Sequence, residues 1–269
     1  MALRLVDYPS SDEDSSSDGS SNAGRDYCSS DDGRSKQTNA ADAVNTALPR
    51  HGSEDGHQRR FRGAEKYDDA GHALGGWAGH ICLSVQWNAR LEGLAARCIE
   101  EIRSVGAAAG VGRDAVQRIA SPHISLSRPF FVAEHQIART VEEVRRALHG
   151  QTGLAVAYSA ASVYVNERGD RCFVGVDVGA GGELVAELVA RVDAVLAGMG
   201  KRRFFRRPRF HLSLVAVDLG PVADVPGFAR AVETRLGQMV QEIRRLPASR
   251  IDAVDCFFGG RQHPVALGH

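Results

Sequence analysis

The sequence has no closely spaced cysteine pair, no long apolar run and no net charge over its 269 residues. Its cysteines are scattered without a CxxC pair, which disfavours disulfides and zinc and indicates buried thiols in a reducing compartment. They are Cys28, Cys82, Cys98, Cys172 and Cys256. No apolar run approaches the ~18 residues of a membrane-spanning helix, and no apolar segment follows the first methionine. We therefore expect a soluble intracellular protein without a secretory signal.

Aromatic and β-branched residues are scarce in residues 1–75, which contain the Ser/Asp-rich stretch "SSDEDSSSDGSSNAGRDYCSSDDGRS". Such a composition cannot bury enough apolar surface to offset chain entropy, so this leader is predicted to be disordered. It serves either as a solubilising tail or as a phosphorylation target. Residues 76–269 are rich in Val, Leu and Ala, and they are numerous enough for one domain with a substantial core.

Hydrophobic periodicity predicts strands and helices throughout this second part. The predicted strands cover 79–87, 121–130, 154–166, 171–179, 210–218, 251–258 and 261–267, and the predicted helices cover 88–104, 133–149, 182–199 and 226–245. Asn88 is predicted to cap the first helix, and Gly169 to form the tip of a hairpin turn. Because strands and helices do not alternate strictly as βαβ units, we predict an α+β fold with antiparallel sheets.

Two predicted strands each carry a histidine two residues before a serine. The first motif is His123-Ile124-Ser125, the second motif is His211-Leu212-Ser213, and a leucine follows each serine. Side chains two apart in a strand share a face, so each histidine projects beside its serine while apolar residues fill the opposite face. If the two strands lie side by side in separate sheets, the four polar groups converge on one cleft.

Two converging imidazoles can act as base and acid on opposite sides of a phosphodiester, because the pKa of histidine lies near neutrality. The serine hydroxyls can hold non-bridging phosphate oxygens and stabilise added negative charge. One such motif alone is more typical of a hydrogen-bonded core histidine, but two copies 88 residues apart favour chemistry. Zinc is disfavoured because no HxH or HxxxH partner is present, and a serine hydrolase because neither serine lies in a GxSxG turn.

A basic run lies just before the second motif. Residues 76–269 hold 19 acidic and 24 basic residues, a balance of +5, and "KRRFFRRPR" at 201–209 supplies six of the bases. Beside a catalytic motif this run favours a polyanionic partner. Taken alone, it is more typical of a solvated loop or a nuclear-import signal.

The tandem motifs resemble the 2H phosphoesterase superfamily, and their flanks resemble its U6 small nuclear RNA phosphodiesterase family. "GGWAGH" at 75–80 is similar to the opening of that family's first strand, and "VYVNERGDRCFVGVDV" at 163–178 to its Tyr-x-Asn hairpin. "FFRRPRFHLSLVAV" at 204–217 is similar to its second-motif segment, and "LVDYPSSDED" at 5–14 to its acidic leader. The resemblance covers about residues 76–268. It implies two pseudo-symmetric lobes with antiparallel sheets facing a central cleft and helices outside.

This resemblance implies a 3′-to-5′ exoribonuclease that trims the uridine-rich 3′ end of U6 small nuclear RNA in the nucleus, as a monomer without metal or cofactor. His123 and His211 would be the catalytic pair, and Ser125 and Ser213 the phosphate ligands. One imidazole would deprotonate the ribose 2′-hydroxyl, which attacks the adjacent phosphorus. The other would protonate the departing 5′ oxygen, leaving a 2′,3′-cyclic phosphate. Such chemistry selects RNA, because DNA has no internal nucleophile.

Further RNA contacts are implied by the same resemblance. Phe205 stands where many relatives place a tyrosine that stacks on the terminal base, so the stack is kept and the hydroxyl is lost. The other implied contacts are Tyr164, Asn166 and Glu167 in the hairpin, and Arg207, Pro208, Arg209 and Phe210 before the second motif. For Tyr164, a routine strand aromatic is an equally good interpretation. Two alternatives stay open for the whole chain: a 2′,3′-cyclic nucleotide phosphodiesterase or 2′-5′ RNA ligase-like enzyme, and a non-catalytic RNA-binding module.

Overall fold

The alternating segments do form strands in the structure, a computed structural model that describes residues 76–166, 169–220 and 222–268. The predicted leader and Glu167 lie outside these residues. The strands are β1 (Trp77–Ser84), β2 (Val116–Arg118), β3 (His123–Ser125), β4 (Phe130–Val132), β5 (Leu154–Val156), β6 (Tyr158–Val165), β7 (Arg171–Val178), β8 (His211–Asp218), β9 (Ser249–Ile251), β10 (Ala253–Phe258) and β11 (Arg261–Ala266). The helices are α2 (Ala89–Ala108), α3 (Glu134–Ala147), α4 (Gly182–Gly198), α5 (Val225–Leu236) and α6 (Val240–Ile243), with short 3-10 turns at Arg113–Ala115 and Gly237–Met239.

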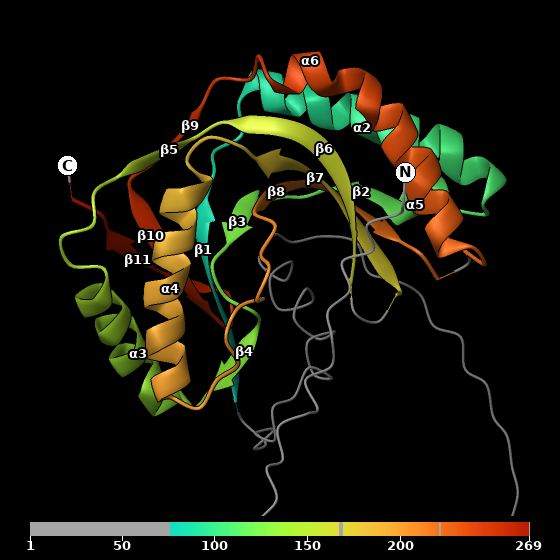
Figure 1. The fold of residues 1–269 in the computed structure, drawn as a ribbon. Coiled ribbons are helices and arrows are strands. Elements are labelled where there is room, and N and C mark those ends of the chain that lie inside the picture. Colours follow the sequence, from blue (N-terminus) through green and yellow to red (C-terminus); the bar gives the residue numbers. More distant parts are fainter. Residues whose placement is uncertain (1–75, 167–168, 221, 269) are drawn as a thin grey trace, which may run out of the picture. The chain divides into compact units, whose positions relative to one another are not determined.

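The strands pair antiparallel, and the two that carry the motifs lie side by side (Figure 1). Within the described part of the chain, nine strands form one sheet with the order β11-β10-β1-β3-β8-β7-β6, to which β2 adds on β8 and β4 on β1. β5 and β9 form a separate pair. The predicted α+β class with antiparallel strands is confirmed. The expectation that the motifs lie in separate sheets is wrong, because β3 and β8 pair directly through Ile124 and Leu212.

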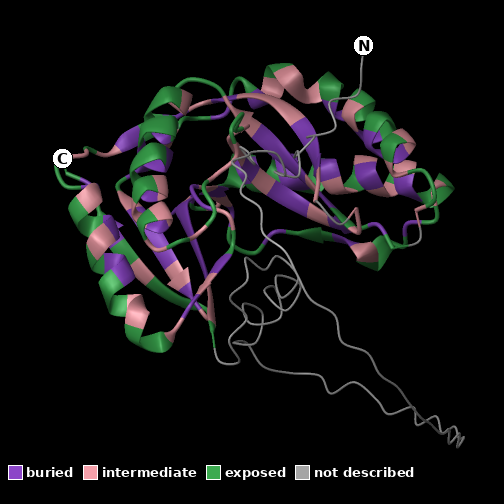
Figure 2. Cartoon of the chain, turned by 60° about the horizontal axis from the view of Figure 1, so that its bottom comes forward, coloured by how far each residue is buried: buried purple, intermediate pink, exposed green. Residues whose placement is uncertain are grey.

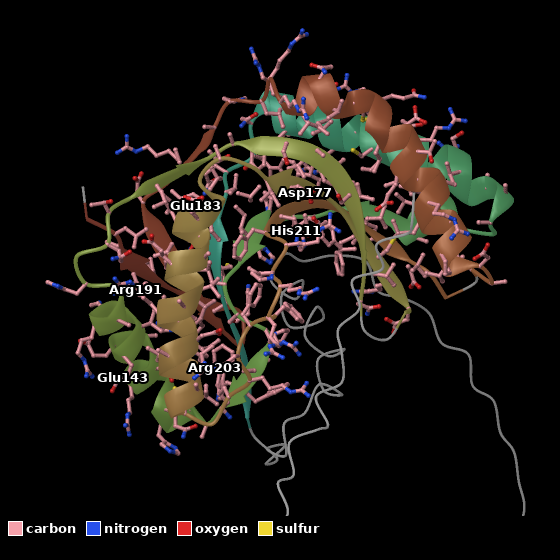
Figure 3. The ribbon with its side chains drawn as sticks, viewed as in Figure 1. Glu143, Asp177, Glu183, Arg191, Arg203 and His211 are labelled. Carbon is pink, nitrogen blue, oxygen red and sulfur yellow. The ribbon has the colours of Figure 1, made fainter. Side chains whose placement is uncertain are left out.

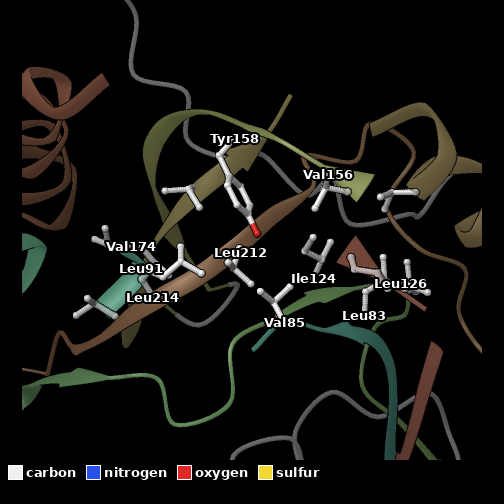
Figure 4. Close-up of a cluster of buried hydrophobic side chains, with 14 of the residues drawn as sticks. Leu83, Val85, Leu91, Ile124, Leu126, Val156, Tyr158, Val174, Leu212 and Leu214 are labelled. Atoms are coloured by element: carbon white, nitrogen blue, oxygen red, sulfur yellow. The ribbon is translucent and has the colours of Figure 1, made fainter. Parts of the chain in front are cut away.

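One face of this sheet is apolar and packs against helices. Ile124 and Leu212 are fully buried at the centre of that face, together with neighbours on β1 and β8 (Figure 4). Helix α2 contributes residues such as Leu91 to the same core. Its start is fixed by Asn88, whose side-chain oxygen accepts from the backbone N–H groups of Arg90 and Leu91 at 3.1 and 3.0 Å. The predicted cap is therefore confirmed. Figure 2 shows the buried strands beneath helices whose outer residues are exposed.

Three predicted elements are divided. The strand predicted over 121–130 is β3 (His123–Ser125), and its last residue, Phe130, already belongs to β4. The strand predicted over 154–166 breaks at Ala157, because β5 pairs with β9 while β6 pairs with β7. The helix predicted over 226–245 is interrupted by the 3-10 turn that begins at Gly237, a residue with low helix propensity. The hairpin turn is where the sequence predicts it, with Gly169 at φ +70°. No helix among the described residues is both long and apolar enough to cross a bilayer.

Four of the cysteines lie in the part of the chain that the structure describes. Cys82, Cys98, Cys172 and Cys256 are all buried and free, as the scattered pattern predicts. Burial raises the pKa of each thiol, to about 12 for Cys98, Cys172 and Cys256. These side chains therefore act as small apolar core residues.

Gly175 lets β7 approach β8 at the second motif. A Cβ atom at this position would lie 2.7 Å from the backbone oxygen of Leu212, next to the register shift between Val174 and Gly175. We expect Gly175→Ala to lower the free energy of unfolding by about 1–3 kcal/mol, the typical cost of overpacking. Urea denaturation measures this change.

The matched control is Gly93→Ala on the exposed face of α2, where nothing lies within 4 Å of the added Cβ. This substitution is expected to stabilise the protein by about 0.5–1 kcal/mol, because alanine is the better helix former. Equal stabilities for the Gly175→Ala variant and the unsubstituted protein would contradict the close approach of the two strands.

Candidate active site

The pairing of β3 with β8 brings the two motifs together. Ile124 and Leu212 are cross-strand partners and both are fully buried, so the residues that flank them project from the opposite face. Antiparallel strands run in opposite directions, which places the histidine of each motif beside the serine of the other. All four polar side chains are partly exposed. The structure thus gathers His123, Ser125, His211 and Ser213 on one patch of the sheet.

The two histidines are diagonal neighbours in this register. Diagonal cross-strand residues lie about 7–8 Å apart, a separation across which long side chains still interact. In agreement, the charge of His123 is one of the influences that lower the pKa of His211. A phosphodiester placed between the rings would have one imidazole on each side.

Each histidine is oriented by the same local hydrogen bond. Nδ1 of His123 lies 3.0 Å from the backbone oxygen of Ser121, and Nδ1 of His211 lies 2.8 Å from the backbone oxygen of Arg209. A carbonyl oxygen can only accept, so Nδ1 is the donor in both rings. Nε2 is then the atom that gains or loses a proton at the site.

His211 is surrounded by side chains from the two strands beyond it. The ring of Tyr164 stacks on the imidazole at 3.6 Å between centroids and 14° between planes, and its hydroxyl donates to Asp177. Asp177 is the cross-strand partner of His211, and both are labelled near the centre of Figure 3. Burial is the main cause that lowers the pKa of His211, while the hydrogen bond to Arg209 and the charge of Asp177 oppose it. The imidazole is therefore held mostly neutral at pH 7.

His123 has a different aromatic neighbour. The ring of His80, on β1, lies 5.3 Å from that of His123 with a tilt of 50°. His80 in turn stacks on Phe257 of β10 at 4.9 Å, and the two are cross-strand partners. Each motif histidine is therefore packed by a ring from elsewhere in the sheet, although the two rings differ in chemistry.

The basic run is anchored to the domain by a carboxylate. Asp193 of α4 accepts a hydrogen bond of 2.8 Å from the backbone N–H of Phe204. Beside it, the guanidinium of Arg128 lies 4.0 Å from the centre of the Phe205 ring. Arg128 follows the first motif by three residues and Phe205 precedes the second by six, so both motifs contribute to this contact.

The other predicted RNA contacts differ in how far they are exposed and in what they touch. Arg207 and Pro208 are exposed on the basic run, whereas Phe210 is half-buried and its ring stacks with that of Phe204 at 6.2 Å. Arg209 and Tyr164 face inwards, toward Asp177.

Asn166 is occupied within its own hairpin. It donates to the carboxylate of Asp170 at 2.7 Å and accepts from the backbone N–H of Arg171 at 3.1 Å. The structure thus brings the motif residues together with Tyr164 and Arg209. It gives Asn166 a role in the turn, and Glu167 lies outside the described residues.

Sequence reasoning missed Asp177 as a site residue. A signal was present in the strand itself. Val174 and Val176 are almost fully buried on one face of β7, so Asp177 projects from the other face. A carboxylate in that position needs a hydrogen-bond partner. Ser162 and Arg128 were also missed, and the sequence alone offers no comparable signal for them. No cluster of three or more potential metal-ligating side chains occurs in residues 76–166, 169–220 and 222–268.

A protein-family model named HVSL, described as an uncharacterised conserved protein, matches residues 39–256. U6 snRNA phosphodiesterase 1 of Xenopus laevis is 29% identical over 143 residues, which are 53% of this chain and 54% of that protein. The protein of the same name from Danio rerio is 34% identical over 93 residues, 34% of this chain and 33% of that protein. The chain therefore spans about half, or less, of the length of these curated relatives.

The fold is similar to solved structures of Kluyveromyces marxianus Usb1. The structure with uridine monophosphate has a TM-score of 0.58 at 15% identity, covering 71% of this chain and 98% of that one. A second structure of Usb1 gives 0.56 at 16% identity with the same coverage. This likeness shows that the chain shares its fold with these two structures.

Proposed function

The chain belongs to the HVSL family, and we propose that it is a 3′-to-5′ exoribonuclease that trims the uridine-rich 3′ end of U6 small nuclear RNA. The observation that carries the proposal is the β3–β8 register, which sets two imidazoles diagonally across from each other with a serine hydroxyl beside each. The names of the curated relatives support U6 RNA as the substrate. The nucleus as location and a monomeric state belong to the same proposal.

The reaction follows from these four groups. One imidazole takes the proton of the 2′-hydroxyl of the penultimate ribose through Nε2, and the resulting oxygen attacks the adjacent phosphorus. The bond from phosphorus to the 5′ oxygen of the terminal nucleoside breaks, and the other imidazole, initially protonated, gives its proton to that oxygen. The terminal nucleoside leaves and the RNA retains a 2′,3′-cyclic phosphate. Ser125 and Ser213 donate to the non-bridging oxygens as their charge grows.

The basic run would hold the RNA that enters this site. Phe205 stacks on the terminal base, a contact worth about 1–3 kcal/mol per base, and Arg128 packs on the same phenyl ring. Arg207, with Pro208 and Phe210 beside it, would contact the phosphate backbone of the RNA. Binding of RNA through the basic run weakens as the salt concentration rises.

One experiment tests both the activity and its independence of metal ions. Incubation of the protein with a 3′-hydroxyl oligo(U) is expected to shorten the oligomer stepwise, at the same rate with and without EDTA, since the imidazoles supply both proton transfers. Mass analysis of the products should show a terminal cyclic phosphate. Loss of activity with EDTA would contradict the metal-free reaction. Cleavage of small cyclic nucleotides alone would indicate the related phosphodiesterase or ligase-like activity instead.

A further inference from the structure

A closed loop of contacts surrounds the imidazole of His211. Its Nδ1 donates to the backbone oxygen of Arg209, and the guanidinium of Arg209 lies 3.4 Å from the carboxylate of Asp177. The other oxygen of that carboxylate accepts from the hydroxyl of Tyr164, whose ring stacks on the imidazole. The contacts therefore reach His211 at two places: Arg209 binds its Nδ1, and Tyr164 stacks on the face of its ring.

Asp177 is the centre of this loop. Its oxygens accept from three side chains, because Ser162 also donates to it at 2.8 Å, and Ser162 itself accepts from Arg209 at 2.9 Å. Tyr164 is 5% and Ser162 7% exposed, so the two hydroxyl groups that donate to Asp177 are buried, whereas the side chains of Asp177 and Arg209 are partly exposed. Strand geometry explains the arrangement, since Asp177 is paired with His211 across β7 and β8, and Ser162 and Tyr164 lie on the next strand, β6.

We propose that Asp177 is a positioning residue for His211, acting through Tyr164 and Arg209 to fix the direction of Nε2. This inference rests on the proposed function, which assigns His211 to proton transfer. The hydrogen bond at Nδ1 fixes one edge of the ring and the tyrosine fixes its plane, and neither alone determines where Nε2 points. A misplacement of about 1 Å at a reacting group costs about 100-fold in rate, which is why a loop of this kind affects the reaction.

The loop also sets the charge around His211. The charged and titratable groups that face it are Asp177 from β7, Tyr164 from β6, His123 from β3 and Arg209 from its own chain. Burial lowers the pKa of His211, the charges of His123 and Arg209 lower it further, and only Asp177 among these charges raises it. Removal of the carboxylate therefore leaves His211 harder to protonate.

The test compares Asp177→Asn with Asp177→Glu and with the control Asp218→Asn. Asp218 lies at the far end of the same strand pair, exposed and opposite Arg171. On oligo(U), Asp177→Asn is expected to lower kcat about tenfold with KM changed less than about twofold, because the substrate contacts remain and the proton transfer suffers. Asp177→Glu is expected to restore part of kcat, and Asp218→Asn to match the unsubstituted protein.

A second readout does not depend on activity. Nitrogen NMR of the imidazoles, followed through a pH titration, is expected to show a lower pKa of His211 in Asp177→Asn than in the unsubstituted protein, and recovery in Asp177→Glu. Tyr164→Phe keeps the ring and removes the hydroxyl, and it is expected to lower kcat, as Asp177→Asn does. Unchanged kcat and an unchanged His211 titration in folded Asp177→Asn would overturn the inference.

The two readouts separate the failure of this inference from that of the proposed function. If the unsubstituted protein does not shorten oligo(U), the proposed function fails, while the titration still decides whether Asp177 controls His211. If the unsubstituted protein is active but Asp177→Asn changes neither kcat nor the titration of His211, only the positioning role fails. Circular dichroism and the unfolding temperature establish that each variant is folded.

Discussion

Replacement of either motif histidine, as His123→Ala or His211→Ala, is expected to lower the rate of RNA cleavage at least about 100-fold, the usual scale of general acid–base catalysis. The two histidines lie diagonally across the β3–β8 pair, and in each ring Nε2 is the atom that can gain or lose a proton, since Nδ1 donates to a backbone oxygen. Loss of either ring removes one of the two proton transfers. Initial rates with end-labelled oligo(U) measure the effect.

The double variant provides a sharper test of joint action. If the histidines work on one transition state, His123→Ala combined with His211→Ala costs about as much as either change alone, rather than the product of both effects. His149→Ala is the control, because His149 is exposed in the turn after α3 and belongs to neither motif strand. Activity that survives in both single variants would leave only a non-catalytic RNA-binding role for the motif face.

The core of the site could be predicted from the sequence because it depends on the period of a strand. A histidine and a serine two residues apart must share a face in any sheet, and flanking residues such as Ile124 and Leu212 mark the other face as the core. The same periodicity located most elements to within a few residues. The tandem motifs and their flanks then implied the family fold.

The remaining features depend on partners that are distant in the sequence. The direct pairing of β3 with β8 reflects the register of strands 88 residues apart, and local pattern carries no information about it. The break at Ala157 has the same origin, because β5 takes its partner from β9. The inward contacts of Arg209 were also hidden, since a basic residue beside other bases is read as a surface charge until Asp177 is found next to it.

Removal of one 2′-hydroxyl from the substrate is expected to stop the reaction at a predictable position. An oligo(U) with 2′-deoxyuridine at its penultimate position should be cleaved at less than about one thousandth of the rate of the all-ribose oligomer, because intramolecular attack supplies much of the rate and no other nucleophile is held at the phosphorus. Base, phosphate and stacking contacts are unchanged by the substitution. Quantification of the released terminal nucleoside measures the effect.

The same substitution moved by one residue is the matched control. The 2′-hydroxyl of the terminal nucleotide takes no part in the first cleavage, so an oligomer with 2′-deoxyuridine only at its 3′ end should lose that nucleoside at nearly the full rate. A metal-bound or enzyme-held water as nucleophile would instead cleave both oligomers. Equal rates for the two substrates would therefore exclude cyclic-phosphate formation, even if both histidines proved essential, and the imidazoles would then have to activate water rather than the ribose.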